Sequence, residues 1–176
     1  EVKGDTTPLS YGINSKVVRG KDGKLMEQTW KVGGMYGQAI EQIVMWLEKA
    51  QGVAESPEQA KVLGLLIEFY RTGDLKKWDE FNIAWVMDKS STVDLISGFV
   101  EVYNDPLGKK GSYESCVEVI DPVATKNMRA IQENAQWFED HSPLMEEHKK
   151  KEVVGITYSF INTVGEAGDA APSTPI

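Results

Sequence analysis

Apolar side chains recur every third or fourth residue through much of the first half of the chain, a period typical of helices buried on one face. The pattern predicts helices over residues 36–51, 57–72 and 75–87. Ser56 and Pro57 form a strong start for the second of these, because the hydroxyl can cap free amides and proline suits the first helical turn. Asp74 can cap the third helix in the same way.

Alternation of apolar and polar residues marks the strands. A hairpin is predicted over residues 13–30, because Asp22-Gly23 is a strong signal for a tight turn between two strands. Further strands are predicted over residues 92–103, 113–120 and 153–164, with a turn over 104–108 after the first. Ser97-Gly98 weakens that first strand, because glycine packs poorly inside a sheet.

A helix over residues 122–140 should follow Asp121-Pro122, an N-cap and first-turn pair. A short polar helix over 142–150 is expected next, and the Gly- and Pro-rich tail from Gly165 reads as loop. The candidates for the buried face of the long helix are Ala124, Met128, Ile131, Ala135 and Phe138. The fold class is therefore α+β, with several helices packed against a small, mostly antiparallel sheet.

The chain is acidic, with 19 Lys and Arg against 27 Asp and Glu, for a formal net charge of −8. This charge argues against nucleic acid or an anionic membrane as the main partner. No apolar run approaches the roughly 20 residues that span a bilayer. Cys116 is the single cysteine, which fits a reducing compartment such as the cytoplasm. The chain opens at Glu1 without a methionine and stops after a Pro-Ser-Thr-Pro stretch, so we expect a piece of a longer protein.

Several kinds of active site find little support in the sequence. The two histidines, His141 and His148, are seven residues apart, and the His-Glu-x-x-His pattern that places two imidazoles on one helix face does not occur. We interpret both as surface residues. A Gly-x-Ser-x-Gly motif is absent, and Cys116 lies within a predicted strand, where a buried, inert thiol is expected. We therefore expect no metal or cofactor site in this chain.

The most informative stretch is residues 98–108, which read Gly-Phe-Val-Glu-Val-Tyr-Asn-Asp-Pro-Leu-Gly. Glu101 and Tyr103 are two apart, so in a strand they point to the same face. Asp105 follows them, and Glu114 and Glu118 lie on the next predicted strand. Glu101 and Tyr103 could act together as a functional carboxylate and phenol. Alternatively, Glu101 could be one of the two carboxylates of a glycosidase-like site, or both residues could belong to an ordinary solvent-exposed face.

Six blocks in order along the chain resemble the dipeptidyl peptidase III family, notably its bacterial members. They are residues 11–15, 30–37, 70–74, 85–89, 98–108 and 134–143. The Glu-x-Tyr-x-Asp-Pro block that contains Glu101 and Tyr103 is the most specific of them. Asn104 departs from eukaryotic members, which carry arginine there.

The resemblance implies a two-lobed zinc exopeptidase, of which this chain is the part upstream of the zinc-binding helix. Residues 1–121 and 151–176 would belong to the lower, β-core lobe that binds peptide, and 122–150 would be a helical excursion toward the upper lobe. The isolated chain should then form a single compact domain. Zinc, its ligands, the catalytic glutamate and a later substrate-docking strand would lie in the rest of the parent enzyme.

By the same resemblance, Glu101 is the carboxylate that binds the free N-terminal ammonium of the peptide. Tyr103 is the catalytic phenol that hydrogen-bonds the developing oxyanion. The parent would release dipeptides from peptides with a free N-terminus, whereas this fragment alone would be inactive. The alternative is a non-catalytic module that binds or scaffolds peptides.

Overall fold

A computed structural model describes residues 12–154 and 158–168 of the 176-residue chain. Tyr11, residues 155–157 of the last expected strand, and the tail beyond 168 lie outside the described residues. The elements in chain order are β1 (Ser15–Arg19), β2 (Leu25–Thr29), α1 (Gly37–Gln51), α2 (Pro57–Thr72), α3 (Leu75–Met87), β3 (Val93–Glu101), β4 (Ser112–Ile120), α4 (Pro122–Glu133), α5 (Ala135–Asp140), a 3₁₀ turn (Glu146–His148) and β5 (Ile161–Gly168).

The three central helices begin and end close to where the sequence predicts. At the start of α2 the Ser56 hydroxyl accepts the N–H of Gln59 at 3.0 Å, and the helix ends at Gly73, whose φ of 71° suits a residue without a Cβ. The Asp74 carboxylate accepts the N–H of Lys76 at 2.9 Å and starts α3. The bonds that start and end these helices join residues that are close in the sequence, which explains why the helix ends could be predicted.

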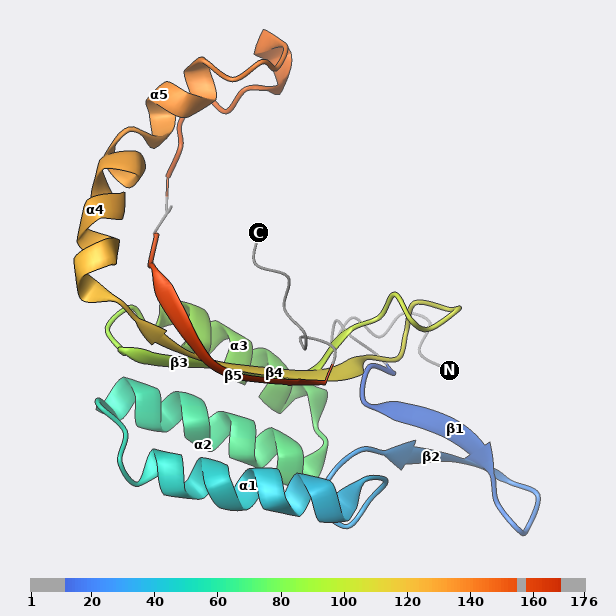
Figure 1. Cartoon of the computed structure of the whole chain (residues 1–176). Helices are drawn as coiled ribbons and strands as arrows, with labels where there is room; N and C mark the ends of the chain where they lie inside the picture. Colours follow the sequence, from blue (N-terminus) through green and yellow to red (C-terminus); the bar gives the residue numbers. More distant parts are fainter. Residues whose placement is uncertain (1–11, 155–157, 169–176) are drawn as a thin grey trace.

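The strands form two separate sheets. β1 and β2 are the predicted antiparallel hairpin, and β3, β4 and β5 form an antiparallel sheet with β4 in the middle. In Figure 1, α1 and α2 lie on one side of the three-stranded sheet, while α4 and α5 rise from the other. The α+β class is confirmed.

The core lies between the three central helices and β3. Its largest fully buried side chains are Ile40, Leu66, Phe69 and Tyr70. The hydroxyls of Tyr70 and Ser97 are 2.8 Å apart and join α2 to β3. A Cβ at Gly98 would lie only 2.4 Å from the ring of Trp78, so α3 packs closely against the same strand. Both contacts fix the strand that leads to Glu101.

The continuous helix expected over residues 122–140 is wrong, because α4 and α5 meet at Asn134. Its expected buried face is also wrong, since no residue of either helix is buried and Phe138 exposes half of its surface. The two helices leave the sheet in Figure 1, which agrees with the absence of buried residues on them. Of the short helix expected over 142–150, only the turn Glu146–His148 forms.

The last strand is displaced toward the C-terminus of the chain. β5 begins at Ile161, not at residue 153, and continues to Gly168, so the loop expected from Gly165 is wrong over 165–168. Residues 161–168 pair with β4 from Ile120 to Glu114, with a bulge on the way. Pairing with a neighbouring strand therefore overrides the weak strand preference of these glycines. None of the helices in the described ranges is long and apolar enough to cross a membrane.

Candidate functional site

Glu101 is the last residue of β3 and lies opposite Ser112 of β4. A bulge precedes it, because Phe99 opposes Tyr113 whereas Glu101 opposes the adjacent Ser112. Adjacent residues of a strand point to opposite faces, so the extra residue turns Glu101 away from the face of Phe99. Phe99 is 6% exposed and belongs to the core, while Glu101 is exposed. The bulge thus places the Glu101 carboxylate on the solvent-exposed side of the sheet.

Tyr103 lies beyond the strand, in a turn. The N–H of Asp105 donates to the carbonyl of Val102 at 3.0 Å, and this bond ends the ladder before Tyr103. The expectation that Glu101 and Tyr103 share one face of a continuous strand is therefore wrong. The tyrosine is 69% exposed and follows the exposed carboxylate by two residues, so both side chains reach solvent at the same end of the sheet.

The turn is tied to the following loop by Asp105. Its carboxylate accepts the N–H groups of Lys109 at 2.8 Å and Lys110 at 3.1 Å. These two bonds, ahead of the nearby ammonium of Lys110, lower the pKa of Asp105. The side-chain amide of Asn104 donates to the Ser112 hydroxyl at 3.2 Å, which joins the turn to the residue opposite Glu101. The loop after β3 is therefore held by specific bonds.

The neighbouring strand carries a cysteine among carboxylates. Cys116 is buried, and its thiol donates to Glu118 at 3.2 Å. Burial first, and then the contact with Glu118, raise the pKa of Cys116 to about 11. The thiol is thus protonated at neutral pH, as expected of an inert cysteine. Glu114, Glu118 and Glu101 all belong to one sheet, whereas glycosidase carboxylates face each other across a bound sugar.

Both histidines are exposed, as predicted. His141 stacks on Trp137 with ring centroids 4.2 Å apart, and its Nδ1 lies 2.7 Å from the Trp137 carbonyl. His148 lies in the 3₁₀ turn. Within residues 12–154 and 158–168, no group of three or more His, Cys, Asp or Glu side chains could hold a metal ion. The described residues therefore do not fit a zinc site.

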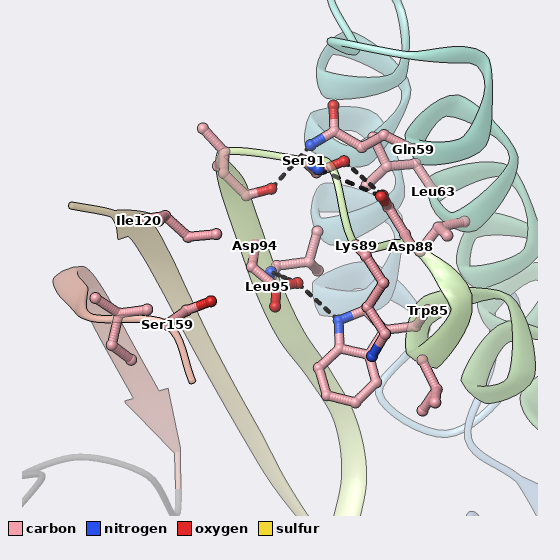
Figure 2. Close-up of a pocket in the computed structure, with 14 residues that line it drawn as sticks. Gln59, Leu63, Trp85, Asp88, Lys89, Ser91, Asp94, Leu95, Ile120 and Ser159 are labelled. Carbon is pink, nitrogen blue, oxygen red and sulfur yellow. Dashed lines mark hydrogen bonds between the residues drawn. The ribbon is translucent and has the colours of Figure 1, made fainter. Parts of the chain in front are cut away.

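A pocket of about 270 Å³ lies at the opposite end of β3, between α2, α3 and the sheet (Figure 2). Several of its polar groups are bonded to residues that also line it. The indole N–H of Trp85 donates to Asp94 at 2.7 Å, the Ser91 hydroxyl donates to Asp88, and the Gln59 amide donates to the Val93 carbonyl at 2.8 Å. Neither Glu101 nor Tyr103 lines this pocket, so the structure separates it from the predicted site residues.

A second hollow, of about 480 Å³, lies beside the Glu101 end of the sheet. It is mainly apolar, and Trp30, Tyr36, Phe99 and Tyr113 contribute its aromatic walls. The Trp30 and Phe99 rings pack with centroids 4.8 Å apart. Glu101 does not line this hollow, although Ser112, the residue opposite it on β4, does.

The family of this chain follows from three comparisons. A model of peptidase family M49 matches residues 14–173, which include Glu101, Tyr103 and most of the chain. Dipeptidyl peptidase 3 of Homo sapiens is 24% identical over 140 residues, covering 80% of this chain and 19% of that protein. Nudix hydrolase 3 of Arabidopsis thaliana is 27% identical over 136 residues, covering 77% of this chain and 17% of that protein.

Solved structures show the same fold. Dipeptidyl peptidase III from Caldithrix abyssi superposes with a TM-score of 0.75 at 24% identity, over 90% of this chain and 30% of that one. The enzyme from Corallococcus sp. strain EGB superposes with a TM-score of 0.65 at 20% identity. The chain belongs to peptidase family M49, and the resemblance read from the sequence is confirmed. It spans about a fifth of the length of the curated dipeptidyl peptidase it matches.

Two features of this site escaped the sequence reasoning. The first is the bulge before Glu101, for which the sequence carries only the weak signal of a glycine earlier in the strand. The second is the bonding of Asp105, which the sequence presents only as a carboxylate that follows Tyr103. An aspartate at the start of a Pro- and Gly-containing loop commonly accepts downstream N–H groups, and that signal was present.

Proposed function

We propose that this chain supplies part of the peptide-binding lobe of a zinc-dependent dipeptidyl peptidase, which releases dipeptides from peptides with a free N-terminus. The observation that carries the proposal is the family match across residues 14–173, which includes the Glu101 and Tyr103 block. Zinc would supply Lewis-acid chemistry in the parent. Its ligands would come from parts of the parent other than the residues described here, and the isolated chain would not hydrolyse peptides.

In this proposal Glu101 binds the N-terminal ammonium of the substrate. An exposed carboxylate at the end of a hydrogen-bonded strand has a fixed position. When it binds the N-terminal ammonium, the second peptide bond of the substrate therefore lies at a set distance from it. A charge-assisted bond of this kind contributes about 1.5–3 kcal/mol, and blocking the amine removes it. The site would therefore discriminate strongly between free and acetylated N-termini.

Tyr103 would act at the reacting carbonyl. Its phenol can donate a hydrogen bond to the oxygen that gains negative charge in the transition state, and such a donor contributes mainly to turnover. Its exposed place in the turn, two residues beyond Glu101, supports this role because the side chain can reach a peptide bound over the carboxylate. Asn104, beside it, would influence which peptides bind.

Kinetics of the parent enzyme test both roles with a dipeptidyl-naphthylamide and its N-acetyl derivative. Glu101→Gln should raise KM for the free substrate by about 10- to 100-fold and leave the acetylated one unchanged. Tyr103→Phe should lower kcat by about 100-fold or more. Glu118→Gln removes the same charge from the neighbouring strand and should change neither value much. A Tyr103→Phe enzyme with raised KM alone would refute the role given to the phenol.

The helical excursion, α4 and α5, would pack against the upper lobe of the parent. Val123, Trp137 and Phe138 are each at least half exposed, which supports a missing partner for these helices. Residues 1–121 and 151–176 would remain in the lower lobe. Trp137→Ala should then destabilise the parent more than the isolated chain, and equal effects in the two would contradict this division.

A second candidate function is a non-catalytic module that binds extended peptides. The exposed strand β5 favours it, because among the described residues only β4 pairs with it and its outer edge could accept a further strand. In this case the 176-residue chain should bind an unblocked peptide and its N-acetyl derivative alike, whereas the Glu101 site proposed above would prefer the unblocked one. The single cysteine supports the cytoplasm as the compartment, which cell fractionation tests.

A further inference from the structure

Asp105 is bonded through its backbone and its carboxylate alike. Its N–H donates to the Val102 carbonyl at 3.0 Å, and its own carbonyl accepts the N–H of Gly108 at 2.8 Å. One carboxylate oxygen accepts the N–H groups of Lys109 and Lys110, and the other lies 3.8 Å from the Lys110 ammonium. Although the surrounding loop is mostly exposed, the Asp105 side chain is only 11% exposed.

Tyr103 lies within the segment of chain that these bonds close. The turn from Val102 to Asp105 contains the tyrosine, and the carboxylate joins that turn to the residues just before β4. The Tyr103 side chain is 69% exposed, and the backbone that carries it belongs to this turn. Glu101, in contrast, is placed by the ladder with β4. The separation between the two side chains thus depends on how firmly the turn is held.

We propose that Asp105 is a positioning residue, which holds Tyr103 at a set place relative to Glu101 by closing the loop between β3 and β4. This inference rests on the proposed function, since it concerns the same site. The carboxylate itself is turned into the loop, where it accepts the backbone N–H groups of Lys109 and Lys110. Its effect on catalysis passes through Tyr103, because a displacement of about 1 Å in a catalytic group can cost about 100-fold in rate.

The decisive experiment combines Asp105→Ala with Tyr103→Phe in the parent enzyme. Asp105→Ala alone should lower kcat by about 10- to 100-fold, with a smaller change in KM. In the Tyr103→Phe background the same change should have little further effect, because there is no phenol left to misplace. Asp105→Asn should recover part of the activity, since its amide oxygen can still accept the Lys109 N–H.

Asp88 provides a matched control. Its carboxylate also accepts two backbone N–H groups, from Ser90 at 3.1 Å and Ser91 at 3.3 Å, but it lines the pocket at the other end of β3. Asp88→Ala should lower stability to a similar degree and leave kcat unchanged. If Asp88→Ala and Asp105→Ala lower kcat alike, or if Asp105→Ala acts equally in both backgrounds, the positioning role is refuted.

A second measurement does not depend on activity. Backbone ¹⁵N relaxation in the 176-residue chain should give an order parameter for Tyr103 near 0.85, falling below about 0.6 in Asp105→Ala and unchanged in Asp88→Ala. An unchanged value in Asp105→Ala would overturn the inference whatever the kinetics show. If the order parameter falls but Tyr103→Phe leaves kcat intact, Asp105 still positions the turn, and it is the role proposed for Tyr103 that fails.

Discussion

The hydrogen bond between Tyr70 and Ser97 should be a measurable link between α2 and β3. Tyr70 is fully buried, Ser97 is 6% exposed, and their hydroxyls are 2.8 Å apart. Burial, followed by the neighbouring Tyr113, raises the pKa of Tyr70 well above its ordinary value, so the phenol keeps its proton. The informative perturbations are Tyr70→Phe, Ser97→Ala and the two together.

The expected magnitudes follow from which group is left without this bond. Tyr70→Phe leaves the buried Ser97 hydroxyl without its partner and should cost about 1–3 kcal/mol of unfolding free energy. Ser97→Ala should cost less, because the Tyr70 phenol can turn toward Tyr113. The double variant removes both groups, so its cost should fall below the sum of the single costs by at least about 1 kcal/mol.

Urea unfolding of the 176-residue chain, followed by tryptophan fluorescence, measures all four proteins. The dependence of the free energy on urea should stay the same, which shows that the variants differ in stability alone. Tyr36→Phe is the control, because that tyrosine is 56% exposed, and it should change the free energy by less than about 0.5 kcal/mol. Strictly additive costs for Tyr70 and Ser97 would refute the reasoning, since independent groups cannot be partners.

Two further predictions concern the same strand. Gly98→Ala should lower the free energy of unfolding by about 1–3 kcal/mol in the same assay, because the new Cβ would meet the packed ring of Trp78. Gly165→Ala is the control and should be nearly neutral, since there is open space around that residue. Equal costs would contradict the packing argument. The Glu55 carboxylate accepts two backbone N–H groups at the start of β3, which lower its pKa from 4.5. The stability that this carboxylate adds is therefore present above that pH and lost as the pH falls through the lowered pKa. The difference in unfolding free energy between the unsubstituted 176-residue chain and Glu55→Gln should shrink on acidification. A difference that grew would exclude this cause.

Local signals were sufficient for the helices that build the core. Ser56, Asp74 and Asp121 each accept backbone N–H groups at the starts predicted for them. Capping is an interaction among a few consecutive residues, so it can be read without knowledge of the fold. The predicted face of residues 122–140 failed because burial depends on a partner surface, and within the described part of the chain no residue of α4 or α5 is buried.

For the candidate site, the sequence names Glu101 and Tyr103, whose roles stay predictions, and it misses their geometry. The sequence identified Glu101 and Tyr103 as neighbours at the end of a strand, but it treated them as two positions of one regular ladder. Only the register with β4 reveals the bulge that turns Glu101 outward and the turn that removes Tyr103 from the strand. Register is a relation between segments, and the spacing within one segment does not contain it.

The amino-acid sequence was enough to predict the fold class, the ends of the central helices and the block that carries the family resemblance, and it contains no His-Glu-x-x-His motif. Each of these depends on residue type and short-range spacing. The extent of β5, the exposure of α4 and α5, and the bonds of Asp105 next to Tyr103 became visible only in the folded chain. Those features depend on which distant segments meet, because pairing and burial are set by contacts across the chain rather than along it.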